Sequence, residues 1–221
     1  MRGKPERPDA ATAGQEAAPA LPPYPGIRLA DVFLVQSAQQ AGAARDALLA
    51  SDTIGFDTES KPTFLKGEAS TGPHLIQFAT DRAAYLFQVG SSPTPDVLAA
   101  LAAVLCAPGT LKVGFGLSDD LKRLRGKLGI STAPVLDLSV ALRGGQRNTL
   151  GAKTAVAKFF GQHLQKSKKI STTNWAMPRL SDKQLLYAAD DAQVALRIYR
   201  HWRAATAAAA PATPPPAPAP A

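Results

Sequence analysis

Thr53-Ile54-Gly55-Phe56-Asp57-Thr58-Glu59 joins an apolar run with β-branched and aromatic residues to two carboxylates. The run predicts a buried strand that ends near Asp57. Successive side chains of a strand point to opposite faces, so Asp57 and Glu59 should share one face and Thr58 the other. Two carboxylates on one face repel each other unless a cation lies between them. The stretch suggests a metal site, although two acids leaving a strand are more often a solvated turn.

A third carboxylate, Asp120, lies in a segment that leucine spacing predicts to be a helix from Leu117 to Leu128. Asp120 borders the leucine stripe, whereas Asp119 points elsewhere. A carboxylate beside a buried stripe needs a partner, because burying an uncompensated charge is costly. Taken alone, Asp120 is better explained as a first-turn acid that the helix dipole favours.

The last predicted helix begins after Ser181, an N-cap followed three residues later by Gln184, and continues to Tyr199 or beyond. Helical spacing places Tyr187 and Asp191 on one face and Asp190 on another, which makes Asp191 the inward acid. Their Cβ atoms should lie roughly 5–6 Å apart. A lone tyrosine at this spacing is more often an ordinary core residue, but beside Asp191 it becomes a mechanistic candidate.

In this order and spacing, the three motifs resemble those of the tyrosine-type DEDD 3′–5′ exonuclease domains, the branch that includes ribonuclease D and the exonuclease domain of the Werner helicase. Leu186 stands where histidine-type relatives carry their general base. The resemblance spans roughly residues 27–202, and Ser60 replaces the tryptophan of the Werner-like pattern, which leaves substrate preference open. Three further stretches support the resemblance: Leu75-Ile76-Gln77-Phe78, Lys112-Val113-Gly114-Phe115-Gly116-Leu117 and Asn174-Trp175.

The resemblance implies an enzyme, a phosphodiester hydrolase that acts at a free 3′ end and releases nucleoside 5′-monophosphates. Two Mg²⁺ or Mn²⁺ ions about 3.5–4 Å apart would clamp the attacking and leaving oxygens. Asp57 would bridge both ions, Glu59 and Asp191 would complete the ion that activates water, and Asp120 would hold the second, directly or through water. Tyr187 would orient the water, because a phenol with an unperturbed pKa near ~10 stays protonated at neutral pH.

The implied fold is ribonuclease H-like, and residue patterns agree with an α/β domain in which helices flank a mixed sheet. Adjacent early strands predict an antiparallel portion, with parallel strands added later. Strands are expected at Val32–Val35, Thr53–Thr58, Leu75–Ala79, Ala84–Val89, Leu111–Phe115 and Val135–Leu136. Helices are expected at Ala38–Leu49, Pro95–Leu105, Leu117–Leu128, Thr149–Phe160 and Asp182–Tyr199.

Composition predicts one domain at residues 25–203, because 45% of the 221 residues are hydrophobic and can form a substantial core. Residues 1–24 and 204–221 are rich in Pro and Ala without periodicity, and we expect both to be disordered tails. We find no signal-peptide pattern and no membrane-spanning stretch. The expectation is a soluble, intracellular protein without a membrane partner, cytoplasmic if the source is bacterial.

The formal net charge of +8 belongs to the central domain, since the two tails contribute none of it. A basic domain suits a polyanion, so the expected partner is nucleic acid, with DNA favoured and RNA as the second possibility. Such an enzyme would belong to DNA repair or other nucleic-acid metabolism. Each basic residue alone is more often a solvated surface charge. Candidate substrate contacts are Thr58, Phe115, Arg143, Arg147, Lys166, Lys168, Lys169 and Trp175.

Two other functions compete with the exonuclease. The same basic cleft could hold nucleic-acid ends without cutting them, and the same fold could support an endonuclease. Other site types fail on spacing: the third glycine of a dinucleotide loop that starts at Gly114 would fall at Asp119, and His74, His163 and His201 are too scattered for a zinc site.

Overall fold

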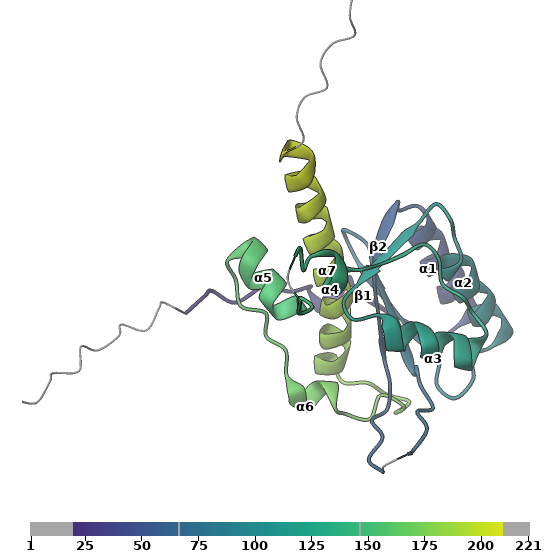
Figure 1. The fold of residues 1–221 in the computed structure, drawn as a ribbon. Coiled ribbons are helices and arrows are strands. Elements are labelled where there is room, and N and C mark those ends of the chain that lie inside the picture. Colours follow the sequence, from purple (N-terminus) through teal and green to yellow (C-terminus); the bar gives the residue numbers. More distant parts are fainter. Residues whose placement is uncertain (1–19, 66, 146, 210–221) are drawn as a thin grey trace, which may run out of the picture.

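The computed structural model describes residues 20–65, 67–145 and 147–209, and six strands within them form one mixed sheet (Figure 1). The spatial order of the strands is β1-β4-β3-β2-β5-β6. Strand β3 is antiparallel to both of its neighbours, β2 and β4, while β5 and β6 run parallel to β2. The expected division into antiparallel and parallel portions is confirmed. The strands are β1 (Val32–Val35), β2 (Thr53–Glu59), β3 (Leu75–Ala79), β4 (Ala84–Gln88), β5 (Leu111–Gly114) and β6 (Val135–Asp137).

All five helices expected from hydrophobic spacing are present, joined by short elements that this spacing does not reveal. The five are α1 (Ala38–Leu49), α2 (Pro95–Leu105), α3 (Ser118–Leu128), α5 (Ala152–Phe160) and α7 (Asp182–Ala209). The short elements are η1 (Leu29–Asp31), α4 (Leu138–Ala141) and α6 (Lys168–Ser171). Asp137 and Ser167 cap α4 and α6, and one turn is too short to show a helical period.

Helices cover both faces of the sheet (Figure 1). On one face α1, α2 and α3 pack against a buried aromatic group in which Phe56 stacks on Phe78 and Phe78 meets the edge of Phe87. On the other face α7 and α5 close two further apolar clusters. The central strands β2 and β3 are therefore buried on both faces, which agrees with their nearly continuous apolar sequences.

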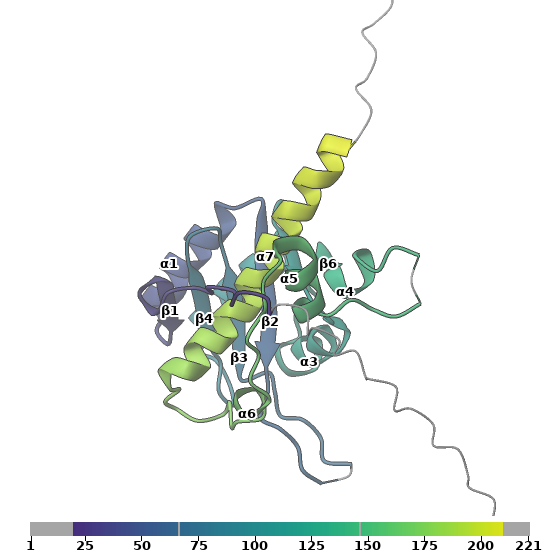
Figure 2. The ribbon, with the colours of Figure 1, turned by 90° about the vertical axis from the view of Figure 1, so that its left-hand side faces the viewer.

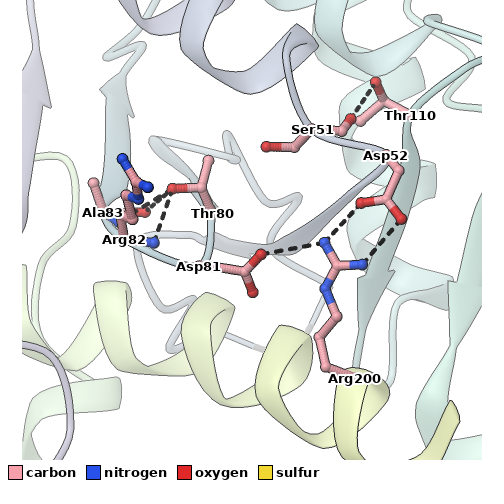
Figure 3. Close-up of polar contacts among 8 residues, drawn as sticks. All are labelled: Ser51, Asp52, Thr80, Asp81, Arg82, Ala83, Thr110 and Arg200. Atoms are coloured by element: carbon pink, nitrogen blue, oxygen red, sulfur yellow. Dashed lines mark hydrogen bonds and ion pairs between the residues drawn. The ribbon is translucent and has the colours of Figure 1, made fainter. Parts of the chain in front are cut away.

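Helix α7 crosses the sheet obliquely and packs on β2 and its neighbouring strands (Figure 2). The expected cap is present, because the Gln184 backbone N–H donates to Ser181 Oγ and the Gln184 side chain accepts from the Ser181 N–H. Farther along, the Arg200 guanidinium donates to both oxygens of Asp52, at 2.7 and 2.9 Å, and to Asp81 at 3.3 Å (Figure 3). These contacts fix α7 to the residue before β2 and to the β3–β4 turn.

The folded part extends beyond the expected boundaries at both ends. Tyr24 is buried, its N–H donates to the His163 carbonyl, and the His163 N–H donates to the Pro22 carbonyl. Helix α7 continues to Ala209, because alanine is the strongest helix former and the sequence there is alanine-rich. The rest of the two expected tails, residues 1–19 and 210–221, lies outside the described residues. None of the described helices is both long and apolar enough to cross a membrane.

Candidate active site

Strand β2 carries Asp57 and Glu59 at its C-terminal end, where both side chains are partly buried. Asp57 lies opposite Gln77 in the antiparallel ladder with β3, and Glu59 lies opposite Leu75. Gln77 is fully buried, and neither polar atom of its amide has a hydrogen-bond partner among the described residues. The pairing of β2 with β3 therefore places two carboxylates and an unpartnered amide in one region of the sheet.

Helix α7 brings Asp191 to the β2 carboxylates. Asp191 is buried, while Asp190 turns away and accepts a hydrogen bond of 2.7 Å from the Ile27 N–H. The inward orientation expected for Asp191 is confirmed. One turn earlier, the Tyr187 ring packs against the buried Trp175 ring, with centroids 6.1 Å apart. The predicted tyrosine and the last aspartate thus lie beside β2 from the same helix.

Lys166 also enters this cluster, from the loop between α5 and α6. Its Nζ lies 2.8 Å from Asp191 Oδ1 and 5.9 Å from the centre of the Tyr187 ring. The sequence suggested Lys166 only as a surface phosphate contact. Its loop has no periodicity that could reveal an inward side chain, so this position comes from the tertiary structure alone.

Burial raises the pKa of Asp57, Glu59 and Asp191, and neighbouring carboxylates raise the pKa of Asp57 and Glu59 further. Burial raises the pKa of Asp57, and the Asp191 charge raises it further. The pKa of Glu59 rises to about 9 through burial and the charges of Asp57 and Asp191. Burial raises the pKa of Asp191 although Lys166 opposes the change. Nearby protein groups therefore do not fully stabilise the ionised carboxylates, and an added cation would favour their ionised forms.

Tyr187 and Lys166 keep their protons in this environment. Burial and the Asp191 carboxylate raise the pKa of Tyr187 to about 12. Burial lowers the pKa of Lys166, but Asp191 and Asp57 together raise it above its ordinary value. The site thus contains a neutral phenol and a charged ammonium group.

Asp120 lies on α3 at the margin of the cluster. The Thr58 hydroxyl donates to Asp120 Oδ1, and Arg123 Nη1 lies 3.7 Å from the same oxygen. As the side chains stand, no three Asp, Glu, His or Cys residues in the described ranges converge closely enough to surround one ion. Thr58 engages Asp120 and Lys166 engages Asp191, so these two acids are turned toward protein partners. The oxygen donors nevertheless match what hard divalent cations bind.

The expected substrate contacts are spread over several surfaces. Lys168 and Lys169 are exposed on α6, beside α7, whereas Arg143 and Arg147 are exposed in the segment between α4 and α5. Phe115 is half-buried against the apolar cluster of α5 and α7.

Two of the expected contacts are corrected. The Trp175 ring is 0% exposed and its Nε1–H donates to the Ser171 carbonyl, so it supports Tyr187 from within the core and cannot reach a substrate. The Thr58 side chain is also buried and is used in holding Asp120. Sequence spacing cannot separate a buried tryptophan from one on a binding surface.

A cavity of about 260 Å³ lies beside Tyr187, between α6, α7 and the Tyr24-Pro25 segment. A larger cavity of about 670 Å³ lies farther along α7, between Phe160 and Arg197, and none of the cluster carboxylates lines it. The chemistry of the carboxylates, rather than cavity size, therefore identifies the candidate site.

Comparisons with known proteins agree with this geometry. The 3′-5′ exonuclease family model matches residues 32–205. The chain is 34% identical to the exonuclease mut-7 homolog of Aedes aegypti over 206 residues, 82% of this chain and 28% of the relative. It is 28% identical to the bifunctional 3′-5′ exonuclease/ATP-dependent helicase WRN of Mus musculus over 152 residues, 67% of this chain and 11% of the relative. The chain thus spans less than a third of either relative.

The crystal structure of the Aedes aegypti Nibbler EXO domain resembles this fold with a TM-score of 0.71 and 29% sequence identity, over 83% of this chain and 93% of that one. The likeness confirms the expected ribonuclease H-like architecture.

Proposed function

The chain belongs to the 3′-5′ exonuclease family, and we propose that it hydrolyses the terminal phosphodiester bond at a free 3′ end of nucleic acid. The products would be nucleoside 5′-monophosphates and a strand shortened by one residue. The observation that carries the proposal is the meeting of Asp57 and Glu59 from β2 with Asp191 from α7, beside Tyr187.

Two divalent cations, Mg²⁺ or Mn²⁺, would be held by Asp57, Glu59, Asp191 and Asp120. This donor set fits them because it consists of carboxylate oxygens whose mutual repulsion a cation relieves. When bound, the ions would stabilise developing negative charge and make water a stronger nucleophile.

The protein's own groups have separate roles in this proposal. Tyr187, which stays protonated, orients the attacking water by hydrogen bonding. Trp175 fixes the Tyr187 ring from behind. Lys168 and Lys169 on α6, with Arg143 and Arg147 between α4 and α5, contact the phosphates of the strand.

DNA is the favoured substrate in this proposal, and RNA is the alternative. Both present the same phosphodiester to the carboxylates, and they differ at the 2′-hydroxyl. The net charge of +8 supports binding to either polymer, because phosphate contacts are largely independent of sequence.

The test is degradation of 5′-labelled DNA and RNA, single-stranded and duplex, with Mg²⁺ or Mn²⁺. A ladder that shortens from the 3′ end is expected, and EDTA, Asp57→Ala and Asp191→Ala should each abolish it. A circular single strand should resist cleavage, and its cleavage would indicate an endonuclease instead. Failure of the folded protein to cut any of these substrates with either ion would refute the proposal.

A non-catalytic module that holds nucleic-acid ends is the second candidate. It is favoured by the contacts of Asp191 with Lys166 and of Asp120 with Thr58, which engage these two carboxylates with protein partners. Binding of 3′ ends without cleavage in the same experiment would support it.

A further inference from the structure

Lys166 is the only basic side chain, among those described, that contacts Asp191. The Lys166 side chain is 28% exposed and that of Asp191 is 5% exposed, and Nζ and Oδ1 lie 2.8 Å apart. By contrast, Lys168 and Lys169, which follow within three residues, are exposed on α6. The inward position is therefore specific to Lys166.

The backbone on both sides of Lys166 is anchored. Leu164 is buried in the cluster beneath α5 and α7, and the Ser167 hydroxyl accepts a hydrogen bond from the Ile170 N–H at the start of α6. The lysine side chain, with its flexible four-carbon stem, is held by neither contact. Displacement of its ammonium group from Asp191 would require rotation about side-chain bonds rather than movement of the anchored loop.

Asp191 Oδ1 is thus in contact with one positive charge, and a divalent cation bound by the same carboxylate would introduce two more. Like charges at contact distance repel strongly where water is largely excluded. We propose that Lys166 is an internal counter-cation, which neutralises Asp191 before a divalent ion binds and is displaced from Oδ1 when it does. The inference rests on the proposed function, because it takes Asp191 to be a ligand of that ion.

The first test is the affinity for Mn²⁺ by isothermal titration calorimetry, without nucleic acid. Lys166→Gln should bind Mn²⁺ about tenfold more tightly than the wild type, because the ion no longer competes with an ammonium group. Lys166→Arg keeps the charge and should stay near the wild-type affinity. Lys153→Gln removes an exposed charge on α5 and should also leave the affinity unchanged.

The second test uses the wild-type protein and does not depend on the folding of a variant. The side-chain NMR resonances of Lys166, assigned by their absence in Lys166→Arg, should shift as Mg²⁺ is added, while those of Lys153 should not. Resonances of Lys166 that stay unchanged at saturating Mg²⁺ would overturn the inference, because the ammonium group would then keep its place beside Asp191.

The calorimetry separates this inference from the proposed function. Equal Mn²⁺ affinities for the wild type and folded Lys166→Gln would reject the counter-cation and leave the metal site intact. Absence of Mn²⁺ binding by both proteins would reject the metal site itself, and the inference with it.

Discussion

Gly55 and Ala192 approach so closely that a β-carbon on Gly55 would lie 1.9 Å from the Ala192 carbonyl oxygen. Gly55 precedes Asp57 by two residues on β2, and Ala192 follows Asp191 on α7. The contact sets the separation of strand and helix at the level of the two carboxylates. A glycine at this position therefore brings Asp57 and Asp191 together.

Gly55→Ala should destabilise the fold and reduce activity, because the new methyl group forces α7 away from β2. Overpacking of this kind costs typically about 1–3 kcal/mol, which urea denaturation would measure. Gly42→Ala is the matched control: Gly42 lies within α1 with open space around it, and the change should stabilise the protein by about 0.5–1 kcal/mol. Equal stabilities for Gly55→Ala and the wild type would contradict the close approach.

Asp120→Asn should lower the exonuclease rate at least about a hundredfold, the equivalent of about 3 kcal/mol of transition-state stabilisation. Asp119→Asn provides the control from the adjacent position, since Asp119 is exposed and, within the described part of the chain, pairs only with Lys122, at 3.2 Å. That variant should retain wild-type activity. The comparison requires single-turnover rates at saturating Mg²⁺, and similar losses in both variants would remove Asp120 from the proposed site.

Tyr187→Phe should lower the turnover rate by about ten- to a hundredfold while substrate binding and stability stay close to wild type. The substitution removes the hydroxyl that orients water but keeps the ring that packs on Trp175. Rates and dissociation constants for a 5′-labelled strand would show whether the loss lies in the chemical step. Full activity of the phenylalanine variant would exclude a role for the hydroxyl.

Replacing Lys168 and Lys169 together by Gln should weaken nucleic-acid binding and make it less sensitive to salt. If each contacts one phosphate, the slope of log K against log[salt] should become shallower by about 1–2. Fluorescence anisotropy with a labelled strand across a salt series measures this slope. Lys153→Gln, which removes an exposed charge from α5, should leave it unchanged, and an unaltered slope in the double variant would argue for another binding surface.

The buried Lys112 side chain should make the free energy of unfolding depend on pH. It is fully buried, its Nζ donates to the carbonyls of Ala107 and Ala133, and burial lowers its pKa to about 8 from 10.5. Between these values the unfolded chain holds the proton more firmly than the folded one, so stability rises with pH in this window. The rise should reach about 3 kcal/mol by pH 10.5 and should be absent below pH 8.

Lys112→Met isolates this effect from the other titrating groups. The free energy of unfolding of the methionine variant minus that of the wild type should be constant below pH 8 and should decrease as the pH rises toward 10.5. Urea denaturation of both proteins from pH 6 to 10.5 would show it. A difference that does not change with pH would mean that the folded protein binds the Lys112 proton as firmly as the unfolded chain.

Most of the fold could be predicted from the sequence because its elements have strong local patterns. The β-branched run before Asp57 gave β2, and leucine spacing around Asp120 gave α3. The C-terminal end of α7 could not be placed from the sequence, since an alanine-rich segment is compatible with both a helix and a disordered tail. The segment around Tyr24 was missed for a different reason: its hydrogen bonds are to His163, which is distant in sequence.

The candidate carboxylates and the face of α7 on which Asp191 lies could be predicted from the sequence, because side-chain direction in strands and helices follows from local backbone geometry. The contact of Lys166 with Asp191 and the burial of Trp175 behind Tyr187 could not be predicted in this way. Both positions follow from how loops pack against α7 in the folded molecule. Such contacts join residues without any shared period, so no local pattern records them.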